Sequence, residues 1–131
     1  MTRFAVLALI LGIALFSRTT VLWAHHGAQV AFDTTKEVTW RGVVTSVKWE
    51  NPHTWIYVDV KDENGNVVNW GLESTPPTML ARNGTTPDIL KPGVEVVIKG
   101  NPGWDASKHF GRAGQITFPG RSSTAAGGDN R

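Results

Sequence analysis

The chain has 131 residues, of which 40% are hydrophobic and 18% are charged, and its formal net charge is +2. This length accommodates one small domain and argues against two. The chain contains no cysteine, which excludes a disulfide framework, a thiolate metal site and a cysteine nucleophile.

The N-terminus has the pattern of an export signal. Arg3 precedes an apolar run over residues 4–16, and a short polar stretch then leads to Ala24. A basic start, an apolar run and a small residue at the cut are typical of a secretory signal peptide, and the run is too short to span a bilayer. We therefore expect cleavage after Ala24, a periplasmic or secreted protein, and no membrane span afterwards. An uncleaved N-terminal anchor is the alternative.

Cleavage would change the charge balance. It removes Arg3 and Arg18, so that the remaining basic residues equal the 11 acidic residues in number. The basicity then belongs to the signal, and a nucleic-acid partner is not expected. The predicted divisions of the chain are a signal peptide (1–24), an N-terminal arm (25–36), a β-barrel domain (37–118) and a disordered Gly/Ser-rich tail (119–131).

Hydrophobic alternation predicts an all-β domain. Five strands are expected over residues 37–49, 54–60, 67–73, 94–100 and 112–118. In the first, the alternation slips by one residue at Gly42, which predicts a β-bulge there. Asn64-Gly65 predicts a tight turn that joins the second and third strands, so the first three strands form a meander.

A short helix is expected between the third and fourth strands. Thr75 could cap it, Pro76 could be its first residue, and Asn83-Gly84 could end it. Five strands with a helix in this place match a small OB-like barrel, which is partly open and five-stranded. A small β-sandwich is the alternative. Trp104 is the tryptophan that we most expect to be exposed in a loop.

Two adjacent histidines suggest a metal site at the processed N-terminus. If cleavage falls after Ala24, the amine and the imidazole of His25 could chelate one ion, and His26 or His53 could supply a third nitrogen. Nitrogen-rich sites favour Cu(II), and copper is therefore a possible cofactor. The arrangement is similar to the histidine brace of periplasmic copper carriers and copper oxygenases. The alternative is a solvated histidine pair that binds nothing specific. Further candidate ligands are His109, Asp33 and Glu73.

A second candidate site lies between the first two strands. Asn51-Pro52-His53 interrupts the strand pattern, and tryptophans flank it on both sides. These residues could form an aromatic-walled recess at a barrel rim, which would bind a small ligand or a periplasmic protein. The alternative is a proline-stiffened turn with His53 half exposed. The predicted ligand-binding residues are Trp49, Asn51, His53, Trp55 and Glu73.

No pattern in the sequence predicts catalysis. The GxSxG, SxxK, P-loop and GxGxxG patterns are absent. Glu50, Asp59 and Glu73 could pair as carboxylates, but their spacing does not single them out. We therefore expect a binding protein and not an enzyme.

Several short motifs together resemble an exported bacterial family of unknown function. The resemblance extends to about Phe118 and implies export, a small β-barrel and no established activity. It supplies no site residues. The motifs, in chain order, are His25-His26-Gly27, Phe32-Asp33, Gly42-Val43-Val44, Trp49-Glu50-Asn51-Pro52-His53, Trp70-Gly71-Leu72-Glu73, Leu80-Ala81-Arg82-Asn83-Gly84 and Leu90-Lys91-Pro92-Gly93.

Overall fold

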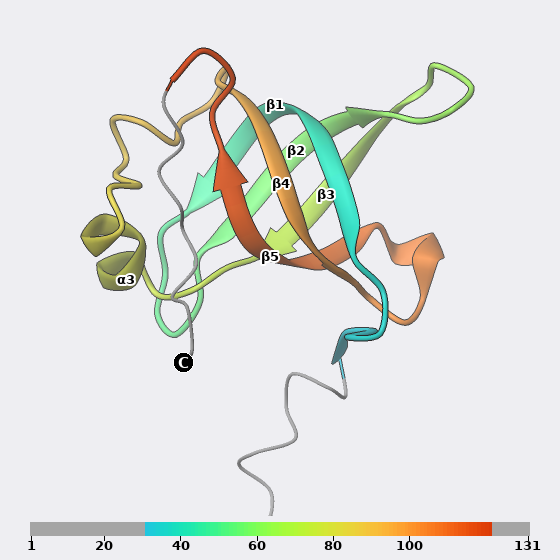
Figure 1. Ribbon diagram of the computed structural model, residues 1–131, viewed down its shortest axis with the longest axis horizontal. Helices are drawn as coiled ribbons and strands as arrows, with labels where there is room; N and C mark the ends of the chain where they lie inside the picture. Colours follow the sequence, from blue (N-terminus) through green and yellow to red (C-terminus); the bar gives the residue numbers. More distant parts are fainter. Residues whose placement is uncertain (1–30, 122–131) are drawn as a thin grey trace, which may run out of the picture. The chain divides into compact units, whose positions relative to one another are not determined.

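The computed structural model describes residues 31–121. The predicted signal peptide, the histidine pair His25-His26 and most of the predicted tail lie outside these residues. The elements are β1 (Val38–Lys48), β2 (Trp55–Lys61), β3 (Val67–Glu73), α3 (Pro77–Arg82), β4 (Glu95–Pro102), the 3₁₀ turn η1 (Ala106–Lys108) and β5 (Phe110–Thr117) (Figure 1).

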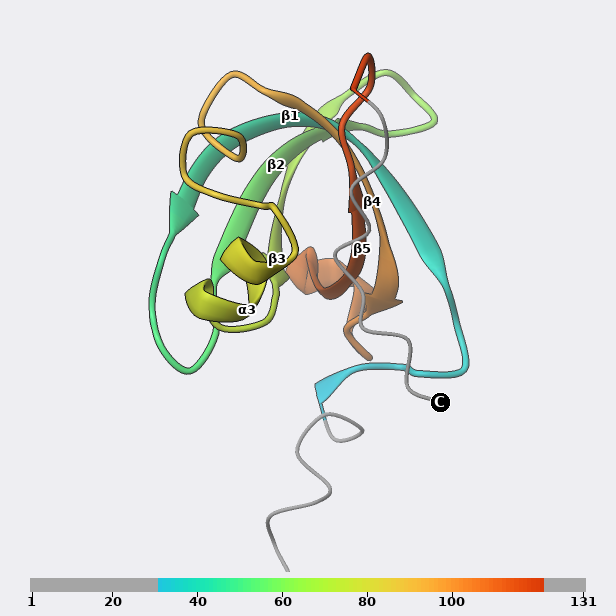
Figure 2. The ribbon, with the colours of Figure 1, turned by 60° about the vertical axis from the view of Figure 1, so that its left-hand side comes forward.

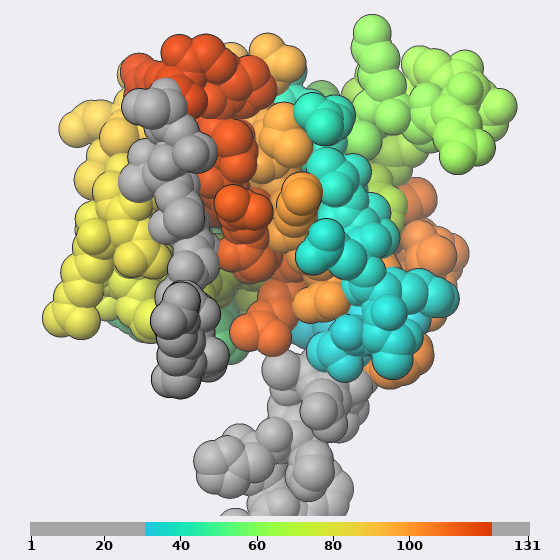
Figure 3. All heavy atoms as spheres, in the orientation of Figure 1, coloured from blue at the N-terminus to red at the C-terminus, as the bar shows by residue number. Residues whose placement is uncertain are grey.

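The five strands close into a barrel in the order β1-β2-β3-β5-β4. The first three strands form an antiparallel meander, and β4 pairs antiparallel with both β1 and β5. Only β3 and β5 run parallel. This topology, with α3 between β3 and β4, confirms the predicted OB-like barrel and excludes the sandwich. The hairpin between β2 and β3 protrudes beyond the barrel (Figures 1 and 3).

The predicted position of the bulge in β1 is wrong. The register against β2 shifts between Val44 and Ser46 and is regular at Gly42. Trp40 and Val44 are both buried, while Val43 between them is 44% exposed, so the alternation passes through Gly42 without a slip. Gly42 has a different reason to be glycine. A Cβ there would lie 2.0 Å from the carbonyl oxygen of Asp59, because β2 passes too close for a side chain.

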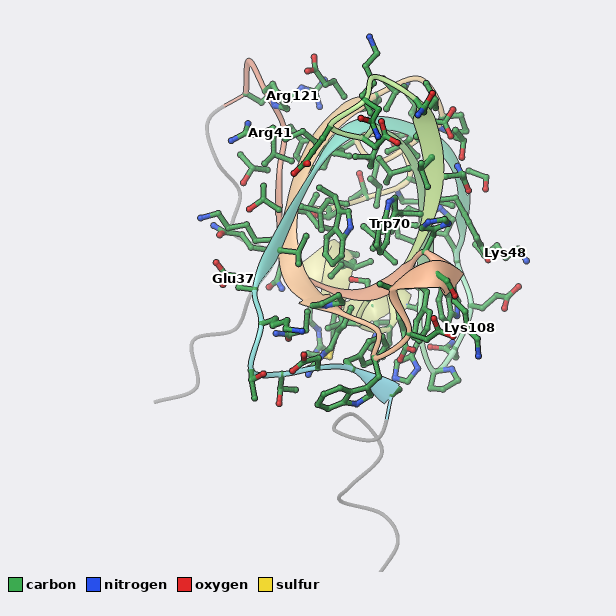
Figure 4. The ribbon with its side chains drawn as sticks, turned by 90° about the vertical axis from the view of Figure 1, so that its right-hand side faces the viewer. Glu37, Arg41, Lys48, Trp70, Lys108 and Arg121 are labelled. Atoms are coloured by element: carbon green, nitrogen blue, oxygen red, sulfur yellow. The ribbon has the colours of Figure 1, made fainter. Side chains whose placement is uncertain are left out.

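The inward side chains of all five strands form one core. Trp40 belongs to this core and is 2% exposed. The centroid of its ring lies 5.5 Å from that of Trp70. Figure 4 looks into the barrel and shows Trp70 inside the ring of strands, with α3 behind it. The other buried hydrophobic members are Val44, Ile56, Val58, Leu72, Leu80, Leu90, Val96, Ile98, Ala113, Ile116 and Phe118.

Helix α3 covers one end of the barrel (Figure 2). Its inward residue Leu80 is 1% exposed, whereas its neighbour Met79 is 47% exposed. The helix begins one residue later than expected: Pro76 occupies the N-cap position, and no side chain caps the helix. Thr75 therefore does not cap the helix. Its carbonyl accepts a hydrogen bond from the backbone N–H of Thr54 at 3.3 Å.

The described part of the N-terminal arm is fastened to the barrel. Phe32 forms an isolated bridge with Gly103, and its ring lies 5.8 Å from that of Phe110. The backbone N–H of Asp33 donates to the carbonyl of Pro102 at 2.9 Å. Phe32 and Asp33 are both buried, so the Phe-Asp motif anchors the chain beside the loop between β4 and β5. Within residues 31–121, no helix is long and apolar enough to cross a membrane.

Candidate ligand-binding face

The outer face of β2 and β3 gathers aromatic and charged side chains in register. Trp55 on β2 lies opposite Lys48 on β1 and opposite Glu73 on β3. Glu73 in turn lies opposite Arg112 on β5. Because side chains alternate across a strand, all four belong to the outer face. They form one row across four strands, at the end of the barrel where β1 and β3 end.

A second row lies beside the first, two residues away on each strand. Tyr57 lies opposite Ser46 on β1 and opposite Gly71 on β3. Gly71 pairs with Phe110, and its backbone N–H donates to the carbonyl of His109 at 3.0 Å. The second row therefore ends at the loop between β4 and β5.

Gly71 leaves the middle of this face without a side chain, and two aromatic rings lean into the space. A Cβ at Gly71 would lie 3.3 Å from Cε1 of Tyr57 and 4.0 Å from Cε3 of Trp55. Both rings are partly exposed, and they reach sideways from β2 over β3. The ammonium of Lys48 lies 5.5 Å from the centroid of the Tyr57 ring, within cation–π range. Trp55, Tyr57 and Gly71 thus form a low aromatic surface, called the aromatic floor below.

His53 and Glu73 are hydrogen-bonded at the edge of this floor. Nδ1 of the imidazole lies 2.8 Å from Oε1 of the carboxylate, and the two side chains are 49% and 21% exposed. The Asn51–Pro52 peptide bond that precedes His53 is cis. The loop is tied to the chain after β3, since the backbone N–H of Ser74 donates to the carbonyl of Thr54 at 2.8 Å. Glu73 fixes the orientation of the ring and leaves Nε2, on its opposite side, for an outside partner.

A polar cluster borders the floor on the other side. The side-chain amide of Asn69 donates to Oδ1 of Asp59 at 2.7 Å and to Oγ1 of Thr45 at 3.1 Å. The Thr45 hydroxyl donates to the carbonyl of Tyr57 at 3.2 Å. Thr45 is the extra residue of the β1 bulge, so the bulge places a hydroxyl on the outer face.

The structure brings together part of the predicted ligand site. His53, Trp55 and Glu73 lie side by side on the outer face, as the register and the contact between His53 and Glu73 show. Asn51 is exposed in the loop. Trp49 is partly buried and packs against the core of the barrel, so it does not form a second wall of the floor. Tyr57 and Gly71 were not among the predicted site residues. Tyr57 shares the alternation of Trp55 and could have been found, whereas Gly71 required the pairing of β2 with β3.

The predicted metal ligands are only partly within the described residues. His25 and His26 lie outside them. Between residues 31 and 121, no group of three or more His, Cys, Asp or Glu side chains is arranged to hold a metal ion. Asp33 uses its carboxylate locally: Oδ1 accepts from the N–H and hydroxyl of Thr35, and Oδ2 lies 3.2 Å from Nζ of Lys36.

His109 belongs to a different place from His53. It follows η1 in a left-handed conformation with φ 47°, and its ring lies edge-on to Trp70 at 5.4 Å. Trp104, in the same loop, is 60% exposed, as expected. In OB-folds, the face of strands 2 and 3 is bordered by the loop between strands 1 and 2 and by the loop between strands 4 and 5. Figure 4 shows Lys48, at the end of β1, and Lys108, before β5, on the same side of the barrel.

The fold and this face define a small OB-like barrel with an aromatic and polar outer surface. The chain belongs to a family of unknown function (DUF6152), whose model matches residues 14–112, and the predicted membership of such a family is confirmed. No curated protein matches. Among solved structures, the chain is similar to TiaS, in the "Crystal structure of the ZRD-deleted mutant of TiaS in complex with agmatine". The TM-score is 0.48 at 19% identity, over 76% of this chain and 24% of that chain. The chain therefore spans about a quarter of that protein.

Proposed function

We propose that the protein is an exported binding protein whose ligand lies on the outer face of β2 and β3. The observation that carries the proposal is the hydrogen-bonded pair of His53 and Glu73, 2.8 Å apart at the edge of the aromatic floor. Partly exposed aromatic rings with a few oriented polar groups beside them are typical of interaction surfaces. The position on the barrel is the one that OB-folds use for ligands. Export rests on the N-terminal sequence pattern.

The partial exposure of Trp55 and Tyr57 supports recognition as the role of this face. The core is formed by the inward side chains, whereas these two rings lie on the outside of the barrel. Large aromatic side chains on a surface mark interaction sites. The half-exposed His53 ring presents Nε2 at a defined position, because Glu73 holds Nδ1.

The direct test is ligand capture by the mature protein. The purified chain is incubated with the low-molecular-weight fraction of a periplasmic extract and examined by native mass spectrometry. We expect a non-covalent adduct on the wild type and on Lys99→Ala, whose site is exposed on β4, away from the face. The adduct should be lost in Trp55→Ala and His53→Ala. Absence of any adduct, or an adduct that all four proteins share, would refute the proposal.

Copper binding through the processed N-terminus is the second candidate function. The observation that favours it is the His53 ring, since a carboxylate on one nitrogen is the usual support of a metal-ligating imidazole. The other ligands would have to come from His25 and His26, and the amine of His25 would have to be freed by cleavage.

The copper proposal has its own test. Cu(II) is titrated into the mature chain that begins at His25 and into the same chain with one alanine added before His25. Stoichiometric binding should weaken strongly in the extended chain, because the added residue converts the amine into a peptide nitrogen. Equal binding by both chains would eliminate the brace, and mass spectrometry of the exported protein shows whether cleavage occurs after Ala24.

A further inference from the structure

We propose that the ligand of the aromatic floor is a neutral oligosaccharide, whose sugar rings stack on Trp55 and Tyr57 over Gly71. This inference rests on the proposed function and names the class of ligand. Three properties of the face lead to it: an aromatic surface, hydrogen-bonding groups on both borders and interspersed charges of both signs.

The first property is the aromatic surface of the floor. The Tyr57 edge lies 3.3 Å from the Cβ position of Gly71, so the ring covers the space that a side chain at position 71 would take. The Lys48 ammonium lies 5.5 Å from the centroid of this ring and is a further hydrogen-bond donor beside it. Trp55 leans over the same glycine. A pyranose ring carries C–H groups on its flat faces, and these faces pack against aromatic rings laid in this way. Any side chain at position 71 would contact the Tyr57 ring and raise the floor.

The second property is the placement of the polar groups. Glu73 and His53 lie along one border, and Asp59 and Asn69 lie along the other. Each carboxylate has lone pairs beyond the one that its partner uses. Sugar hydroxyls project from the rim of the ring and both donate and accept hydrogen bonds. They therefore match carboxylate, amide and imidazole groups that surround an apolar floor.

The third property is the charge. The outer side chains along these paired strands include the cations Lys48, Lys61 and Arg112 and the anions Asp59 and Glu73, so both signs are interspersed. A phosphate polymer would require a continuous track of positive charge, and the two anions interrupt such a track here. The mixed charge favours an uncharged ligand.

A peptide strand is a poorer fit than a sugar chain. Strand addition requires an unpaired sheet edge, but β2 is paired with β1 and with β3 over its length. The floor lies over these paired strands and offers side chains, not backbone groups. A ligand there must be recognised by stacking and side-chain hydrogen bonds, which is how aromatic platforms hold rings.

The experiment is an NMR titration of the mature, isotope-labelled protein with four neutral probes: cellotetraose, maltotetraose, mannotetraose and chitotetraose. We expect at least one probe to shift the resonances of Trp55, Tyr57 and Gly71. Trp55→Ala and Gly71→Val should weaken its binding by roughly tenfold or more. Lys99→Ala should bind as the wild type does. If Gly71→Val does not fold, Glu73→Gln replaces it in the test, because this substitution keeps the size of the side chain. Weaker binding by the folded Glu73→Gln variant would then place the oligosaccharide on this face.

The outcomes separate this inference from the proposed function. If no oligosaccharide shifts the floor at millimolar concentration, or if one binds elsewhere, the saccharide inference is overturned. If the adduct formed with the periplasmic extract still depends on Trp55 and His53, the face remains a binding site for a ligand of another chemical class. An oligonucleotide that binds the floor more tightly than all four probes would also overturn the inference. Loss of both the shifts and the adduct would remove both proposals.

Discussion

Nδ1 of His53 lies 2.8 Å from Oε1 of Glu73, although one residue precedes β2 and the other ends β3. The contact exists because β2 and β3 pair with Trp55 opposite Glu73, which brings the loop before β2 next to the end of β3. This pair links the loop that contains the cis Asn51–Pro52 bond to the outer face of the sheet.

The energetic contribution of this pair to folding should be small. His53 is 49% exposed, and exposed ion pairs contribute little because solvent screens them and their side chains lose entropy. A double-mutant cycle with His53→Ala and Glu73→Ala should give a coupling energy of about 0.5 kcal/mol in urea unfolding. A coupling above about 2 kcal/mol would assign the pair a structural role and weaken the argument for recognition.

Helix α3 provides a matched pair of substitutions. Leu80→Ala removes a side chain that is 1% exposed, and we expect a loss of about 2–4 kcal/mol in the free energy of unfolding. Met79→Ala, one residue earlier and 47% exposed, should change it by less than about 0.5 kcal/mol. Chemical denaturation of both variants checks this difference. Equal effects would mean that α3 does not close the end of the barrel.

Gly42 should tolerate no side chain. In Gly42→Ala the Cβ would lie 2.0 Å from the Asp59 carbonyl oxygen, so β1 and β2 would have to separate. We expect a loss of about 1–3 kcal/mol or more. Gly65→Asn is the control, because Gly65 has a φ of 83° with no atom within 4 Å of its Cβ position and asparagine accepts this conformation. A stable Gly42→Ala variant would contradict the strand register, and thermal melting measures both proteins.

The anchor of the N-terminal arm should weaken in acid. The hydrogen bond from the Thr35 hydroxyl lowers the pKa of the Asp33 carboxyl below its ordinary value, burial opposes this, and Lys36 adds to the lowering. Because the pKa is lower in the folded chain, the ionised carboxylate stabilises the fold above its unfolded pKa of about 3.9. This contribution is lost as the pH falls through the folded pKa.

The measurement is the melting temperature of the wild type and of Asp33→Asn as the pH is lowered. The wild type should be the more stable protein near neutral pH, and the difference should shrink in acid because the amide introduced by the substitution does not titrate. Asp88→Asn, at an exposed site, removes a similar charge without the anchor and should show no such convergence. A difference between wild type and Asp33→Asn that is constant with pH would contradict the role of the carboxylate.

The strands and the helix could be expected from local patterns, because each depends on neighbours in the chain. The range 67–73 was predicted with its observed bounds, since Val68, Trp70 and Leu72 alternate regularly. The bulge was misplaced because Gly42 interrupts the hydrophobic pattern without interrupting the pleat. The role of Gly42 depends on Asp59 of β2, which lies outside the sequence of β1.

Several residues of the site could be identified from their chemistry, but the way in which they are arranged in space could not. His53, Trp55 and Glu73 drew attention through their chemistry, and the structure places them together. Trp49 has the same chemistry and packs on the core instead, because side chains alternate and Lys48 before it points outward. Gly71 has no side chain to draw attention, and its importance comes from the rings of Trp55 and Tyr57 above it.

By itself, the sequence determined the order and approximate bounds of the five strands and the helix, the barrel class and the family, because alternation, turn residues and short motifs are properties of neighbouring positions. The tertiary structure alone decided which side chains share a surface. It joined His53 to Glu73 and laid two aromatic rings over Gly71 because strand register, which forms between distant segments, fixes what lies opposite each residue.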